Sequence, residues 1–75
     1  MTEKEIFEQI YRKHYLSCSF HKLHYNLSYH YSSQQHQEDA LTLAYFEVRD
    51  YRYNEPELVQ YARNVFLNYF SITVN

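Results

Sequence analysis

Potential metal ligands recur at helical spacing in the N-terminal half of the chain, where His14, Cys18 and His21 are followed by His24 one turn later. Imidazole nitrogens and thiolate sulfur are ligands that zinc accepts. A single helix rarely supplies a closed tetrahedral site, however, and this spacing matches no standard zinc finger. A half-buried polar stripe with an inert thiol explains these residues better, so we expect neither a metal nor any other cofactor.

The sequence contains no arrangement of residues typical of a catalytic site. Serine and histidine are present without a nucleophile elbow or a triad, and a chain without glycine lacks a loop that could cradle phosphate. The paired acids Glu38 and Asp39, and likewise Glu55 and Glu57, fit favourable positions near helix N-termini. Because no opposing acid–base partner is visible, we expect a protein that is not an enzyme.

The segment DYRYN, residues 50–54, interleaves Tyr51, Arg52 and Tyr53. Such a cluster can stack on unpaired bases, with about 1–3 kcal/mol for each stacked base. The alternative is a packed corner with a solvated arginine, which the composition favours because tyrosine is abundant throughout the chain. Both interpretations remain open at the level of the sequence.

The composition predicts a small folded unit with aromatic side chains at its surface. The 75 residues allow one domain, residues 1–75, which buries only about 60% of the surface that the unfolded chain exposes. Hydrophobic residues at 45% and charged residues at 21% are typical of folded rather than disordered chains. The ten tyrosines exceed what so small a core can enclose with every hydroxyl bonded, so several should form a contact surface.

Charge and cysteine content restrict the partners and the compartment. The formal net charge of -2 gives no general attraction to phosphate, so any nucleic-acid contact must be local and assisted by a partner. The single cysteine cannot form an internal disulfide, and the sequence shows no apolar signal region and no apolar span of about 20 residues. We therefore expect a cytoplasmic protein without membrane contact.

The lack of glycine and the spacing of apolar residues predict an all-α fold, a compact three-helix bundle. The first helix should start at the capping-box pair Thr2 and Glu5. It should continue with a bend near residues 16–19, where the apolar face changes. Residues 23–31 also alternate like a strand, but we interpret the segment as helix.

Two further helix starts are expected. Ser32 with Gln35 can cap a second helix that runs to about residue 51. Asn54 is a good N-cap for a third helix, which tolerates Pro56 in its first turn and runs to about residue 70.

Each predicted helix has an apolar stripe that should face the core. The three stripes comprise Ile6, Phe7, Ile10, Tyr11, His14 and Tyr15; Ala40, Leu41, Ala44, Tyr45, Val48 and Tyr51; and Leu58, Val59, Ala62, Val65, Phe66, Tyr69 and Phe70. Leu43 and Phe46 are large and apolar but fall outside the second stripe. Off the third stripe lie Gln60, Tyr61, Arg63, Asn64, Leu67 and Asn68.

Three segments carry a resemblance to a known family: EIFEQIYRKHY (5–15), QEDALTLAYFEV (37–48) and YARNVFLNYF (61–70). Their order and spacing resemble region 2 of bacterial sigma factors, particularly of the extracytoplasmic-function type, over residues 3–70. The shared features are Phe7, Tyr11, Arg12 and Tyr15; Glu38 and Asp39; and Ala62, Arg63, Asn64, Asn68 and Tyr69.

The resemblance implies two binding surfaces. The outer face of the second helix would bind the clamp helices of the RNA polymerase β′ subunit through Asp39, Thr42, Leu43 and Phe46. The third helix and the loop before it would open and read the single-stranded −10 promoter element within the polymerase complex. The residues implied in this DNA contact are Tyr51, Arg52, Tyr53, Arg63, Asn64 and Asn68.

The sequence also departs from the family pattern. Thr42 and Leu43 stand where the family usually carries Gln-Glu, and Glu57 stands where a tryptophan is common. The basic run that usually follows the last helix is missing, which removes phosphate contacts. No segment corresponds to region 4, which reads the −35 element, so a second sigma-like protein would have to supply that recognition.

Three functions follow as hypotheses. The first is an accessory subunit for transcription initiation that binds core RNA polymerase and works with a separate −35-binding factor. The alternative is a small sigma-mimicking interaction protein, of phage origin, that inhibits RNA polymerase or a sigma partner. A plain helical module that binds an unrelated protein through its tyrosines is the third.

Overall fold

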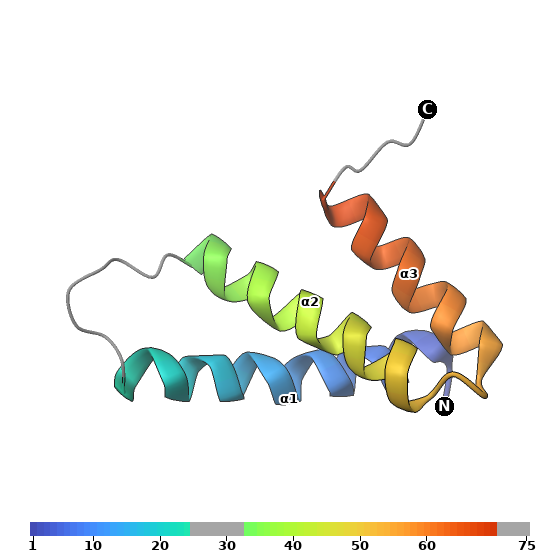
Figure 1. Ribbon diagram of the computed structural model, residues 1–75, viewed down its shortest axis with the longest axis horizontal. Helices are drawn as coiled ribbons and strands as arrows, with labels where there is room; N and C mark the ends of the chain where they lie inside the picture. Colours follow the sequence, from blue (N-terminus) through green and yellow to red (C-terminus); the bar gives the residue numbers. More distant parts are fainter. Residues whose placement is uncertain (25–32, 71–75) are drawn as a thin grey trace.

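The computed structural model describes the backbone of residues 1–24 and 33–70, and the side chains of residues 1–17 and 34–70. The described chain forms three helices, α1 (Glu3–His24), α2 (Ser33–Tyr51) and α3 (Pro56–Phe70). α2 packs across α1, and α3 rises from the end of the molecule where the N-terminus also lies (Figure 1). The predicted all-α three-helix bundle is confirmed.

The predicted start of α1 is confirmed by its hydrogen bonds. The Glu5 backbone N–H donates to Thr2 Oγ1 at 3.2 Å, and the Thr2 backbone N–H donates to Glu5 Oε1 at 3.2 Å. This reciprocal pair is a capping box, which satisfies two backbone donors that the helix leaves without intrahelical partners. Further along, α1 remains helical through residues 16–19, so the change of apolar face there does not end it.

The starts of α2 and α3 differ in detail from the prediction. α2 begins at Ser33, so Glu38 and Asp39 lie in its second turn rather than its first. The predicted cap Ser32 is outside the described residues. At α3 the Glu55 carbonyl accepts the Val59 N–H at 3.0 Å, which makes Glu55, not Asn54, the residue that flanks the helix start. Pro56 occupies the first helical position, where its missing N–H costs nothing.

The core lies where the three helices meet. Its buried members all belong to the predicted stripes and are Phe7, Ile10, Leu41, Ala44, Val48, Leu58 and Ala62. Full burial of a side chain of the Val, Leu, Ile or Phe type stabilises the fold by about 1.5–3 kcal/mol. The alanines are small enough to let the helix backbones approach closely.

Three tyrosines are placed differently from the prediction. Tyr69 was expected in the core stripe of α3 but is 43% exposed. Tyr51 was expected in the core stripe of α2 but is 80% exposed, and it is the last residue of that helix. Tyr61 was expected off the core stripe of α3, yet its ring packs edge to face on Phe7 at a centroid distance of 6.0 Å. Its large ring reaches the core from a position beside the stripe.

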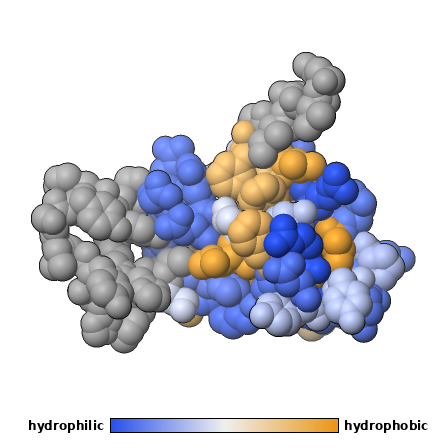
Figure 2. All heavy atoms as spheres, viewed as in Figure 1, coloured by the Kyte–Doolittle hydropathy of each residue, from blue (hydrophilic) through white to orange (hydrophobic). Residues whose placement is uncertain are grey.

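Rings also join α2 to α3. Tyr45 stacks on Phe66 at a centroid distance of 4.8 Å, and Phe66 contacts Phe70 at the same distance. Figure 2 shows apolar side chains gathered over α2 and α3, with hydrophilic residues around them. None of the three helices, over the residues described, is both long and apolar enough to cross a membrane.

Candidate functional site

The outer face of α2 holds four residues that the sequence assigned to polymerase binding. Asp39, Thr42, Leu43 and Phe46 follow each other at steps of three, one and three residues, which places them on one helix face. Leu43 is 43% exposed and Phe46 is 38% exposed, so both keep an apolar surface open to solvent. Thr42 is half-buried, and Asp39 Oδ1 accepts a hydrogen bond from Gln35 Nε2 at 2.9 Å.

Arg49 extends this face by one more turn. Its guanidinium lies over the Phe46 ring, 4.5 Å from the ring centroid, and Arg49 Nε donates to Asp50 Oδ1 at 2.9 Å. Such a cation–π contact restrains the ring and offers a charged edge next to the apolar surface. Leu43, Phe46 and Arg49 are called the α2 patch below. The sequence reasoning missed Arg49, although its spacing of three residues from Phe46 is a signal for the contact.

The predicted DNA-contacting residues at the α2–α3 join are partly engaged within the chain. Arg52 donates to both carboxylate oxygens of Glu55, at 2.6 Å and 3.0 Å, and the Glu55 N–H donates to the Arg52 carbonyl at 3.0 Å. The Arg52 guanidinium is therefore held by Glu55, while about a third of its side chain stays exposed (34%). Tyr51 and Tyr53 are 80% and 75% exposed, so their ring faces remain open to a partner.

The other predicted DNA-contacting residues lie on the outer face of α3. Arg63, Asn64 and Asn68 are all exposed, and Asn64 Oδ1 accepts a hydrogen bond from Gln60 Nε2 at 2.9 Å. Asn64 is eight residues beyond Pro56, which is about 12 Å along the helix axis at 1.5 Å per residue. These residues therefore lie along α3, beyond the join that carries Tyr51 and Tyr53.

His14, the first of the possible metal ligands on α1, is hydrogen-bonded to a carboxylate of α2. The His14 Nε2–H donates to Glu47 Oε1 at 2.8 Å, and Lys13 Nζ donates to the same oxygen at 2.7 Å. Across the part of the chain that the structure describes, no three possible ligands gather at one point. The side chains of Cys18, His21 and His24 lie outside the described residues.

Glu47 is a charged contact between α1 and α2. Burial on its own raises the pKa of Glu47, but the hydrogen bonds and positive charges of Lys13 and His14 outweigh burial and lower it. Glu47 therefore stays ionised and joins the two helices on the side of α2 next to the α2 patch.

His36 is a buried polar residue in the first turn of α2. Its ring stacks on Tyr15 at a centroid distance of 3.9 Å, and its Nε2–H donates to the Tyr15 carbonyl at 2.7 Å. His36 fixes the first turn of α2 against α1. The nearest sequence signal is its position four residues before Ala40, on the core stripe of α2.

Comparisons with protein-family models, with curated proteins and with solved structures found no match for this chain. The sigma-factor resemblance therefore rests on the residues quoted above and stays a prediction.

Proposed function

We propose that this protein binds core RNA polymerase through the α2 patch and acts as an accessory subunit in transcription initiation. In this proposal the clamp of the β′ subunit receives the patch, and a separate factor supplies −35 recognition. The support is twofold: the three sigma-like segments fall on three helices in the expected order, and the helix that docks in that family has an apolar outer face here.

The exposure of Leu43 and Phe46 is the observation that carries the proposal. Large apolar side chains are usually buried in the core of a folded protein. Leu43 and Phe46 instead lie one turn apart on the solvent side of α2. Aromatic residues and arginine are enriched in protein interfaces relative to the rest of a protein surface. Phe46 with the Arg49 guanidinium above it has that composition.

Contact with the −10 element is the second part of the proposal. Exposed rings such as those of Tyr51 and Tyr53 can stack on unpaired bases, and the amides of Asn64 and Asn68 can bond to base edges or backbone. The chain has a net charge of -2, and Arg52 is already paired with Glu55. The affinity for DNA would therefore depend on the polymerase, which holds the opened strands.

The Arg52–Glu55 ion pair also favours a second candidate, an inhibitor that occupies the polymerase clamp without reading DNA. A cation bound in a bidentate pair within its own chain contributes less to phosphate binding. In that case the α2 patch would be used and the exposed residues of α3 would not.

A pull-down from bacterial lysate tests whether the protein binds RNA polymerase. The tagged protein is incubated with bacterial lysate at moderate salt, and the bound proteins are identified by mass spectrometry. The proposal predicts recovery of β′ together with a second sigma-like protein. Recovery of β′ alone would favour the inhibitor, and recovery of no polymerase subunit would contradict both candidates.

Replacing Asn64 with alanine separates the two candidates. The accessory-subunit proposal predicts that Asn64→Ala lowers promoter opening by about tenfold, since a buried hydrogen bond to a base contributes about 1–3 kcal/mol. Polymerase binding should remain unchanged, because Asn64 is on α3 and not on the α2 patch. Gln9→Ala, which removes an exposed amide side chain from α1, is the control. A silent Asn64→Ala variant would support the inhibitor instead.

A further inference from the structure

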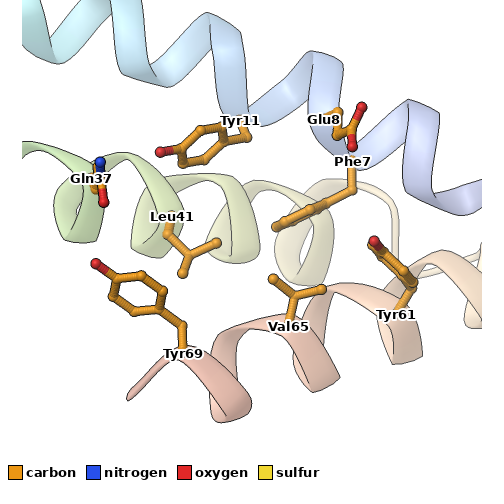
Figure 3. A pocket seen from close by; sticks show the side chains of 8 residues that line it. All are labelled: Phe7, Glu8, Tyr11, Gln37, Leu41, Tyr61, Val65 and Tyr69. Atoms are coloured by element: carbon orange, nitrogen blue, oxygen red, sulfur yellow. The ribbon is translucent and has the colours of Figure 1, made fainter. Parts of the chain in front are cut away.

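A groove of about 240 Å³ lies between the three helices, on a side of α2 that the proposed function does not use. Leu41 lines it, and Leu43 of the α2 patch is two residues later, which is about 200° around the helix. Figure 3 shows side chains from α1, α2 and α3 converging on this space. The lining residues are Phe7, Glu8, Tyr11, Gln37, Leu41, Tyr61, Val65 and Tyr69.

Four aromatic rings form much of the groove wall. Phe7 and Tyr61 meet edge to face at one end, with their planes at 68°. At the other end the hydroxyls of Tyr11 and Tyr69 point to the side where Gln37 lies (Figure 3). Leu41 and Val65 complete the apolar surface between the two ends.

The groove carries negative rather than positive charge. Glu8 is the one acidic side chain among the lining residues, and that set includes no lysine, arginine or histidine. Burial, together with the neighbouring Tyr15 and Tyr69, raises the pKa of Tyr11, so its hydroxyl stays neutral near pH 7. The faces of the rings add a partial negative potential. An anionic ligand would meet repulsion here, and a cation would meet attraction.

We propose that this groove binds a small organic ammonium ion, with the cationic nitrogen against the aromatic rings and near Glu8. Attraction between a cation and ring faces is the established basis of quaternary ammonium recognition by aromatic side chains. The volume is below the roughly 300–1,000 Å³ of pockets that hold drug-sized ligands, which restricts the ligand to a few carbon atoms around one charged nitrogen. The site is independent of the α2 patch and would remain if the polymerase proposal failed.

Choline and two analogues of the same shape test the charge preference directly. In 3,3-dimethyl-1-butanol carbon replaces the choline nitrogen, and 3,3-dimethylbutyrate carries a negative charge. Each compound is titrated into the full chain while amide and tyrosine ring signals are followed by NMR. We expect choline to shift signals of groove residues at concentrations about tenfold lower than the alcohol requires, and the acid to have no effect. Equal binding of the alcohol, tighter binding of the acid, or no shift with choline would overturn the proposal.

Substitutions locate the site. Tyr69→Leu and Glu8→Gln should each weaken choline binding about three- to tenfold, because each removes one source of attraction for the cation. Tyr53→Leu and Glu57→Gln are matched controls outside the groove and should bind choline as the unmodified chain does. Glu8 is exposed, so Glu8→Gln should fold normally. It can therefore test the groove even if Tyr69→Leu fails to fold. Equal choline affinity in a groove variant and its control would contradict the assignment.

Discussion

Glu47 accepts two hydrogen bonds at a single carboxylate oxygen, from Lys13 and from His14, and so connects α2 to α1. The pattern of acidic residues in the sequence did not single it out, because it stands off the apolar stripe and next to no helix start. Its role follows from the way α2 crosses α1. Contacts of this kind depend on the distance between helices, which local spacing does not encode.

We predict that Glu47→Gln destabilises the protein near neutral pH by about 0.2–1 kcal/mol, the range measured for ion pairs that remain partly exposed. The folded-state pKa of Glu47 is lowered from its ordinary value of 4.5, so its stabilising effect is present above that pH. The effect should disappear as the pH falls through the lowered pKa. Urea unfolding of both chains at pH 7 and pH 3 measures it, and a difference that persists unchanged at pH 3 would contradict the assignment.

Arg52 gives a second prediction for a single side chain. Arg52→Lys should lower the free energy of unfolding by up to about 1 kcal/mol, because lysine cannot form the bidentate pair with Glu55. Thermal unfolding measures the change, with Arg63→Lys on the exposed face of α3 as the control. If both variants unfold at the same temperature, the ion pair does not hold the α2–α3 join.

The bounds of the helices could be predicted well where local chemistry determines them. Thr2 with Glu5, Pro56, and the apolar stripes all act within one or two turns, and the structure confirms them. Tyr51, Tyr61 and Tyr69 were misassigned because the burial of a tyrosine ring depends on whether it reaches a neighbouring helix, which local spacing does not encode. For the same reason the sequence indicated exposed rings in general but not the aromatic groove between three helices.

The capping box at the start of α1 should contribute to the stability of the whole protein. Thr2→Ala should destabilise the protein by about 0.5–2 kcal/mol, because the alanine side chain leaves the Glu5 N–H without its acceptor. Thr2→Ser keeps the hydroxyl and should behave like the unmodified chain. Helical content and unfolding followed by circular dichroism test both variants, and equal stability of the alanine and serine variants would show that the capping box is not formed in solution.

The molecule as a whole combines a small core with a large exposed aromatic surface. Leu58→Ala should cost about 2–5 kcal/mol, since Leu58 is 2% exposed, whereas Leu43→Ala should stay within about 0.5 kcal/mol. Both variants replace leucine with alanine, one in the core and one on the α2 patch. Denaturant unfolding measures the free energy of unfolding of each. A large loss of stability in Leu43→Ala would mean that Leu43 supports the fold, and the patch would lose its main evidence.

The division between core and surface also limits what the sequence could predict about the candidate site. The stripe of α2 left Leu43 and Phe46 outside, and their exposure is confirmed. The spacing of three residues allows Arg49 to contact Phe46 and Arg52 to pair with Glu55, but whether each contact forms depends on the side-chain rotamer. The identity of the partner depends on surfaces that this chain does not contain.

The role of the α2 patch is tested by the affinity of purified core RNA polymerase for the unmodified chain and for Phe46→Ala. We expect the unmodified chain to bind and Phe46→Ala to bind at least about thirtyfold more weakly, since an anchor residue of this kind contributes 2 kcal/mol or more. Leu16→Ala, which removes an exposed leucine from α1, should bind normally. No binding by the unmodified chain, or equal binding by Phe46→Ala, would contradict the assignment of the α2 patch as the polymerase-docking surface.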